Sequence, residues 1–427
     1  MITILLYTFY LLFFYFVFRT YSFTSNTGFS FKLWFAVFLL KFLAGCANLY
    51  FHKHAFLAND LFFYYQQAME ELQAGRSNPW EFVRTWLFDW EHMKGHLNFF
   101  QKENMVYWST LGTLVHTKLM TLFTILTLGS EYLNILFYNF LFFLGQLAFY
   151  KTLYSYFPQK KWVLLLTVFF IPSVLFWCSG IHKDGLVFSL SGAIIYCTHH
   201  YLAKKQLRFL LQMIVFLALL LCIRYFYFLC ILPPLLILLI FHSRKKLNWI
   251  FLGAYLVLGI AFFSVKFILP INPLQLIINK QEEYFKAQGY SDMETPLLQD
   301  NVQSFLQNLP VALDHAFLRP YPDPTSKLKY FFHGLDVWFV MAMMLLSLFY
   351  FKRNNWSPIH IFIVFYTLSV LLFIGYTIPN CGAVVRYRSG FIGMLLPVLL
   401  LTSNIPWIAW YEKWTVRSGN RKLSTEK

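Results

Sequence analysis

Long apolar runs recur along the whole chain, and they constrain the fold more than any other feature of the sequence. They are about 17 to 22 residues long, the length at which a helix crosses the hydrocarbon core of a bilayer. Of the 427 residues, 58% are hydrophobic and only 13% are charged. This pattern predicts an all-α protein, a polytopic transmembrane helical bundle that forms a single integral-membrane domain over residues 1–427.

We predict about eleven membrane spans from the positions of these runs. The first run follows Met1 directly, without a basic region before it or a small-residue cleavage site after it. It therefore predicts a first membrane helix and not a removable signal peptide. The predicted spans cover residues 2–18, 33–50, 132–151, 162–178, 184–201, 207–223, 226–243, 248–268, 335–351, 357–378 and 391–410.

The positive charges set the predicted orientation of these spans. The net charge of +16 lies mostly in short links and in the tail, so it does not indicate a nucleic-acid-binding surface. The links after alternate spans carry Lys and Arg without any Asp or Glu, and the tail 411–427 is basic too. We expect all of them on the cytoplasmic face, as in a multi-pass protein of a bacterial inner (cytoplasmic) membrane. The basic link residues are Arg19, Lys32, Lys151, Lys160, Lys161, Lys204, Lys205, Arg208, Arg244, Lys245, Lys246, Lys352 and Arg353.

The number of spans and the side of the first long loop depend on residues 113–128, because this segment is apolar enough to form a twelfth span. If they cross the membrane, the loop 51–112 is cytoplasmic. His116, Lys118 and the modest length favour an interfacial helix instead. Two long extracytoplasmic segments with interfacial helices then follow, 51–131 and 269–334.

Arg386 and Arg388 lie in the predicted short link between the last two spans, on the extracytoplasmic side. Cations in such links are typical of the cytoplasmic face, so these arginines need another explanation. A phosphate-bearing ligand is one, because a guanidinium matches phosphate oxygens in pairs. Singly, each such cation is more often structural and paired with a nearby acid. The cations predicted to gather on this face are Lys183, Arg224, Arg319, Arg386 and Arg388.

Asp60 follows the second span and is the candidate catalytic residue. A carboxylate at the membrane boundary has a raised pKa and could act as a general base for a hydroxyl acceptor. The alternative is that Asp60 caps the helix that begins at Leu61.

Evidence for a metal centre is weak in this sequence. Asp89, Glu91 and His92 could bind a divalent ion, but an interfacial helix anchored by Trp86 and Trp90 is the favoured interpretation. The six cysteines show no CxxC or zinc spacing. We therefore expect no cofactor, with a divalent metal ion as the alternative.

Several landmarks together resemble a known family. They are the acidic residue after an early span, the long loop with interfacial helices, a span that opens after Gly129, and the SGIHKDG, LRPYP and GAVVRYRSG stretches. This order resembles the GT-C superfamily of integral-membrane glycosyltransferases, and a bacterial membrane-protein group that is often labelled as glycosyltransferases. The resemblance covers most of the chain as a pattern of landmarks. It implies a polyprenyl-phosphate-linked sugar donor and a catalytic base at Asp60, although the usual acidic pair is replaced by Asn59-Asp60 and one extra span precedes it.

The resulting hypothesis is a glycosyltransferase that moves a sugar from a polyprenyl-phosphate donor to a glycan or lipid-linked acceptor of the cell envelope, with inversion. The first alternative is an O-antigen or polysaccharide polymerase or ligase that uses lipid-pyrophosphate-linked repeats. The second is a non-enzymatic lipid or solute transporter, which should carry paired ionisable residues inside its spans. The expected partners are the donor, the acceptor and the lipid bilayer.

Reporter fusions test the predicted topology. Fusions within 51–112 and within 379–390 should both report an extracytoplasmic location, because the basic links and the tail lie on the other face. The measurement is alkaline phosphatase activity against a cytoplasmic reporter, with a fusion in 411–427 as the cytoplasmic control. A cytoplasmic signal from 51–112 would put Asp60 and the arginines on opposite faces and sink the enzyme hypothesis.

Overall fold

The computed structural model describes residues 2–55, 60–80, 95–98, 101–286, 291–323, 328–352, 356–406 and 408. Every regular element in this part of the chain is a helix, and β pairing is limited to two isolated bridges, Asp292 with Asn380 and Phe351 with Ser403. The all-α prediction is confirmed.

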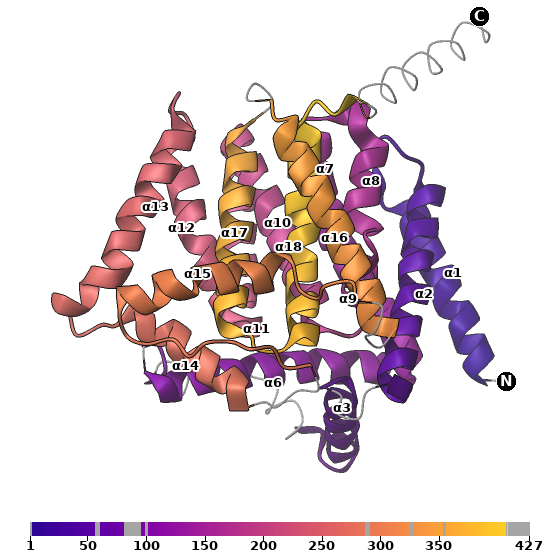
Figure 1. The fold of residues 1–427 in the computed structure, drawn as a ribbon. Coiled ribbons are helices and arrows are strands. Elements are labelled where there is room, and N and C mark those ends of the chain that lie inside the picture. Colours follow the sequence, from indigo (N-terminus) through magenta and orange to yellow (C-terminus); the bar gives the residue numbers. More distant parts are fainter. Residues whose placement is uncertain are drawn as a thin grey trace, which may run out of the picture.

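Most helices stand side by side in one bundle (Figure 1). The first turn of α1 lies at the lower end of the bundle in this view, and the last turn of α18 lies at the upper end. The bundle helices are α1 (Ile2–Thr20), α2 (Phe31–Ala55), α7 (Glu131–Tyr154), α8 (Lys161–Phe169), α9 (Pro172–Trp177), α10 (Lys183–Lys204), α11 (Leu207–Ile223), α12 (Tyr225–Phe241), α13 (Leu247–Ser264), α16 (Leu328–Phe349), α17 (Pro358–Thr377) and α18 (Cys381–Thr402).

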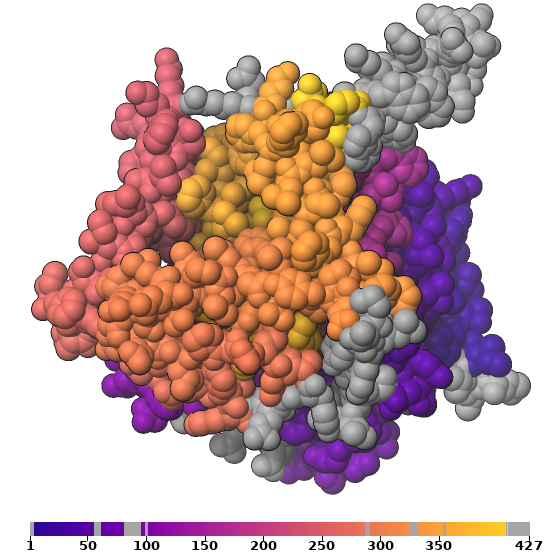
Figure 2. Space-filling view, in the orientation of Figure 1, coloured from indigo at the N-terminus to yellow at the C-terminus, as the bar shows by residue number. Residues whose placement is uncertain are grey.

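Four further helices lie outside this parallel set, and three of them gather at the lower end (Figure 1). The segment of α14 and α15 also covers the lower front of the bundle in the space-filling view (Figure 2). These helices are α3 (Asp60–Ser77), α6 (Lys102–Leu126), α14 (Pro273–Lys286) and α15 (Val302–Phe317). Short 3₁₀ turns occur at Ser22–Thr24, Pro158–Lys160 and Val265–Phe267.

Seven of the described helices are long and apolar enough to cross a membrane, and α1, α11 and α12 are shorter apolar helices. The seven lie in α2, α7, α10, α13, α16, α17 and α18. The segment 113–128 is not among them. Its residues 113–126 form the second half of α6, which runs across the lower end of the bundle instead of alongside the other helices (Figure 1).

The predicted span 162–178 is not one continuous helix. It divides into α8 and α9, with a break at Phe170 and Ile171. Pro172 explains the break, because proline has no N–H to donate and disfavours helical geometry in the residue before it. Ile171 accordingly has φ −58° and ψ 126°.

The last span begins ten residues earlier than predicted, at Cys381 and not at 391. The side chain of Asn380 accepts a hydrogen bond from the amide of Ala383 at 3.1 Å, which caps the helix at this point. The amide of Cys381 also donates to the carbonyl of Ser291 at 2.9 Å. Arg386 and Arg388 are therefore inside α18, and the prediction that they lie in a short link is wrong.

α18 is the central helix of the bundle. In its most apolar stretch 89% of the residues are buried, against 6% in the peripheral α13. A helix buried on all sides must satisfy every polar group it carries with protein partners. Of the two charged residues on α18, Arg388 is fully buried and the side chain of Arg386 is only 16% exposed.

Gly112 lets α6 approach the turn between α11 and α12. A Cβ atom at this position would lie 2.4 Å from the carbonyl oxygen of Ile223, which is backbone and not a flexible side chain. The absence of a side chain is therefore required for α6 to close the lower end of the bundle here.

The substitution Gly112→Leu should destabilise the protein, because the new side chain has to displace either α6 or the α11–α12 turn. Overpacking of this kind costs on the order of 1–3 kcal/mol. The measurement is the midpoint of thermal unfolding in detergent. Gly253→Leu in α13 is the matched control, because nothing lies within 4 Å of a Cβ atom there. Equal midpoints for the two variants would contradict this account of the contact.

Candidate functional site: a buried charge cluster at the lower end of the bundle

Arg386 and Arg388 leave α18 in different directions. Residues two apart on an α-helix are separated by about 200° around its axis. The Arg386 side chain contacts α10, whereas Arg388 donates to the carbonyl of Ala316 in α15 at 3.1 Å. The structure does not bring the two guanidinium groups together, so the prediction of one paired clamp is wrong.

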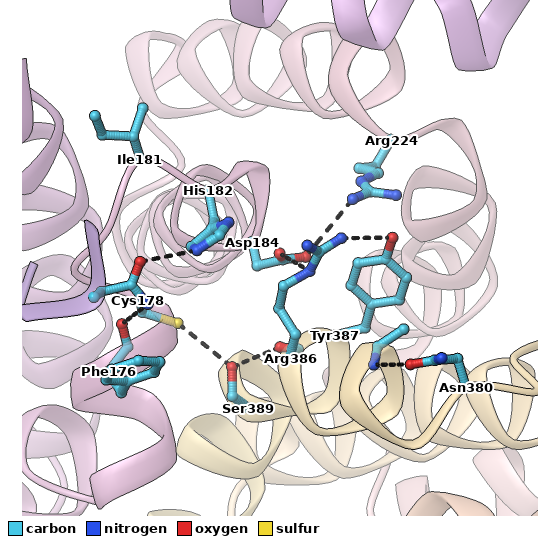
Figure 3. A network of polar contacts seen from close by, with 12 residues as sticks. Phe176, Cys178, Ile181, His182, Asp184, Arg224, Asn380, Arg386, Tyr387 and Ser389 are labelled. Carbon is cyan, nitrogen blue, oxygen red and sulfur yellow. Dashed lines mark hydrogen bonds and ion pairs between the residues drawn. The ribbon is translucent and has the colours of Figure 1, made fainter. Parts of the chain in front are cut away.

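Arg386 forms the centre of a cluster with Asp184 of α10 and Arg224 (Figure 3). Its Nε lies 3.3 Å from Oδ2 of Asp184, and its Nη2 donates to the hydroxyl of Tyr387 at 2.9 Å. Nη2 of Arg224 approaches Oδ1 of the same aspartate at 3.9 Å. Two cations, one in α18 and one at the α11–α12 turn, therefore share one carboxylate, whose side chain is only 4% exposed.

Arg224 is placed by an abrupt reversal of the chain. It is the single residue between α11 and α12, with φ −152° and ψ 84°. Its amide donates to the carbonyl of Leu220 and its carbonyl accepts from the amide of Tyr227, so it serves both helices. The guanidinium group lies 4.7 Å from the centre of the Tyr387 ring. This contact adds a cation–π interaction to the loose ion pair with Asp184.

The hydrogen-bond donors of Arg224 are incompletely used. Its Nε is buried and has no hydrogen-bond partner among the described residues, and the same holds for Oδ1 of Asp184. The separation of 3.9 Å between Nη2 and Oδ1 is too long for a hydrogen bond. Nε of Arg224 therefore keeps an N–H that no described acceptor uses.

Lys280 of α14 adds a third cation beside this cluster, and the sequence analysis missed it. Its Nζ is bonded to Glu283 at 2.8 Å and to Ser109 of α6 at 3.1 Å. Burial lowers the pKa of Lys280, while the carboxylate of Glu283 acts in the opposite direction. No sequence signal distinguishes this lysine, because α14 is a polar helix with charges on several sides.

Two of the predicted cations have structural partners of their own. Nζ of Lys183 donates to the hydroxyl of Thr113 in α6 at 2.8 Å. Arg319 forms an ion pair with Asp314 at 2.9 Å, and its side chain is 40% exposed. The Arg319 contact agrees with the structural alternative of a nearby acidic partner, whereas Lys183 pairs with a hydroxyl group of α6 and not with an acid.

The carboxylate and metal candidates lie largely beyond the described side chains. The backbone of Asp60 is described and forms the first residue of α3, but its side chain lies outside the described part. Asp89, Glu91 and His92 fall outside the described residues altogether. Within the described residues, no group of three His, Cys, Asp or Glu side chains could hold a metal ion.

Lys41 is a second cation that the sequence analysis missed. It lies in the middle of α2, fully buried, and donates to the carbonyl of Cys178 at 2.8 Å and to the hydroxyl of Ser179 at 2.9 Å. These bonds hold the turn that leads into α10 and so help to position Asp184. The signal was available, because a lone lysine inside an apolar run is a candidate for a specific role.

His182 closes the same turn. Its Nε2 lies 3.0 Å from Oδ1 of Asn48 in α2. Burial lowers the pKa of His182 well below its usual range, and nearby His52 and Arg386 act in the same direction. The imidazole is therefore neutral at pH 7 and adds no charge to the cluster.

Arg388 contributes to a separate buried site with Asp336 of α16. A void of about 10 Å³ lies between them and is bordered by Ser173 of α9. Nη2 of Arg388 and Oδ1 of Asp336 are both buried, and neither has a hydrogen-bond partner in the part of the chain that the structure describes. The void is close to the size of one water molecule, which could bridge the two groups.

The fold and these buried charges define a multi-pass helical membrane protein with a cluster of cations at one end of its bundle. Comparison with protein-family models, with curated proteins and with solved structures found no match to the chain.

The substitution Asp184→Asn should destabilise the protein strongly, because it leaves two buried guanidinium groups without their shared carboxylate. Breaking a buried ion pair in this way costs on the order of 3–5 kcal/mol. The measurement is again the thermal unfolding midpoint in detergent. Asp300→Asn is the control, since its ion pair with Lys266 has a carboxylate side chain that is 44% exposed and should contribute about 1 kcal/mol or less. A smaller loss for Asp184→Asn than for Asp300→Asn would overturn this view of the cluster.

Proposed function

We propose that the protein is a membrane glycosyltransferase that takes a sugar from a polyprenyl-phosphate donor and passes it to a glycan or lipid-linked acceptor. The observation that carries this proposal is the state of Arg224. Its side chain is only 14% exposed and lies beside Arg386, Lys280 and aromatic rings. Within the described part of the chain its Nε has no hydrogen-bond partner, and its Nη2 lies 3.9 Å from Oδ1 of Asp184. A buried guanidinium N–H without an acceptor can donate a charge-assisted hydrogen bond to a phosphate oxygen.

The position of the cluster suits a ligand that arrives from the bilayer. It lies where α10, α18 and the α11–α12 turn meet, and α6 and α14 contact it at the lower end. In the proposed topology α8 and α9 together make one crossing, which gives eleven crossings in all. The links at the upper end are the basic ones, so the lower end is extracytoplasmic in a bacterial inner membrane. Segments 51–131 and 269–334 are then the two extracytoplasmic segments.

The proposed role of the cations is to stabilise charge on the leaving phosphate. Arg224 and Arg386 would bind the phosphate oxygens in competition with Asp184, and Lys280 would add to the positive field. Arg388, Arg319 and Lys183 are left with structural roles, since each has protein partners. This division replaces the clamp of Arg386 and Arg388.

The proposed reaction is a single displacement at the sugar. The bond between the anomeric carbon and the phosphate oxygen breaks, and the phosphate leaves with the electron pair. The acceptor hydroxyl forms the new bond and gives its proton to Asp60, the residue at the start of α3. One displacement of this kind inverts the anomeric centre. A polymerase or ligase that uses a pyrophosphate-linked donor would need the same cations and is the alternative enzyme.

A transporter is the second candidate function, and one observation favours it. Asp336 and Arg388 form an ionisable pair inside the bundle, beside the break between α8 and α9. Broken helices and buried charges are typical of transport sites. Uptake of solute by vesicles that contain the purified protein, lost on Asp336→Asn but kept on Arg224→Gln, would favour this candidate over the enzyme.

Binding of polyprenyl monophosphate tests the enzyme proposal. Arg224→Gln and Arg386→Gln should each weaken binding to the purified protein by about tenfold or more, because each removes one charge-assisted pair of hydrogen bonds. Arg319→Gln is the matched control and should bind like the wild type, since Arg319 pairs with Asp314 outside the cluster. Asp60→Asn should bind the lipid normally and lose sugar transfer.

The outcomes separate the alternatives. Preference for a polyprenyl pyrophosphate over the monophosphate would favour the polymerase or ligase. An unchanged affinity in both cluster variants would remove the proposed phosphate site. Normal sugar transfer by Asp60→Asn would remove the proposed base.

A further inference from the structure

A second site lies at the opposite end of the bundle, independent of the cluster at the lower end. It is an open groove of about 420 Å³ between the α12–α13 link, the start of α13, and the start of α17. We refer to it as the upper groove. Its lining residues are Arg244, Lys245, Leu247, Asn248, Phe351, Trp356, Ser357, Pro358, Ile361, Val364 and Phe365. Its volume is in the range of ligand-binding pockets.

We propose that the upper groove binds one anionic phospholipid of the surrounding leaflet, with the phosphate at Arg244 and Lys245 and the glycerol and first acyl carbons along α17.

The two cations of the groove have no carboxylate partner among the described residues. Both are exposed, and neither forms an ion pair within the described part of the chain. The reason is visible in the sequence, which has no acidic residue between Asp184 and Glu282 or between Asp336 and Glu412. Both segments that line the groove come from these acid-free stretches. The positive charge is therefore available to an external anion.

The wall of the groove selects a lipid over a soluble anion. Ile361, Val364 and Phe365 recur at helical spacing, so they form one apolar strip on α17. From Ser357 to Phe365 this strip rises by about 12 Å, which reaches from the headgroup level into the hydrocarbon. Along α13, Leu252 and Leu256 are exposed and continue the apolar surface. An acyl chain fits this strip, and a free phosphate gains nothing from it.

Aromatic groups mark the polar end of the groove. The rings of Phe351 and Trp356 lie 5.6 Å apart between their centres. Nε1 of Trp356 is buried and has no hydrogen-bond partner among the described residues. Tryptophan is enriched at the headgroup level of membranes, where its N–H finds an oxygen acceptor. A glycerol ester or phosphate oxygen supplies such an acceptor.

The test measures lipid retention by native mass spectrometry. The full-length protein is reconstituted into vesicles of equal phosphatidylglycerol and phosphatidylcholine and then extracted into detergent. The wild type should retain one phosphatidylglycerol in preference to phosphatidylcholine. The double variant Arg244→Gln with Lys245→Gln should lose about tenfold or more of this preference, since each cation near anionic lipid contributes about fivefold.

Two further variants make the result specific. Lys204→Gln with Arg208→Gln removes two cations from the end of α10 and the start of α11, and this variant should retain the lipid like the wild type. Val364→Trp fills the apolar strip while both groove cations remain, and it should also lose the lipid.

The proposal is overturned if the groove double variant retains as much phosphatidylglycerol as the Lys204 and Arg208 control. It is also overturned if Val364→Trp retains the lipid fully, or if millimolar inorganic phosphate releases it. None of these outcomes bears on polyprenyl phosphate binding at Arg224, so failure here leaves the proposed function untouched.

Discussion

Burial of a carboxylate between two guanidinium groups is the interaction on which the lower end of the bundle depends. Asp184 lies in the first turn of α10, Arg386 in the second turn of α18, and Arg224 at the reversal between α11 and α12. A charge inside a helical bundle is costly unless an opposite charge compensates it, so these elements must meet at one place. The ion pairs at 3.3 and 3.9 Å show that compensation is present but loose.

Several other contacts keep Asp184, Arg224 and Arg386 in position. Lys41 binds the turn before α10 from inside α2, and Gly112 allows α6 to close against the α11–α12 turn. The strand-like contact between Ser291 and Cys381 fixes where α18 begins. The residue at which α18 begins determines how far along the bundle Arg386 lies. The contact of Cys381 with Ser291, which is distant in the sequence, therefore helps to place Arg386 beside Asp184.

The charge asymmetry of the chain has consequences at both ends of the bundle. At the lower end, Arg224 and Arg386 share the single carboxylate of Asp184, and both guanidinium side chains are largely buried. At the upper end the lining segments contain no acid at all, and the cations are exposed. Positive charge is thus present at both ends in different surroundings. The ligand proposed for the lower end is a phosphate between helices, and the ligand proposed for the upper end is a lipid headgroup at the surface.

The sequence by itself determined that the chain is an all-helical membrane protein, because the length of an apolar run and the composition of a link are local properties. The same local reasoning identified 113–128 as separate from the spans, and it named Arg224 and Arg386. It misplaced the start of α18, since an Asn cap followed by a polar turn looks like a link until the surrounding protein buries it.

Only the tertiary structure decided which charges meet. Helical geometry sends Arg386 and Arg388 to opposite sides of α18, and packing brings Asp184 and Lys280 from distant parts of the chain to Arg224. Long-range contacts of this kind depend on how helices pack, and no local pattern of residues encodes their partners.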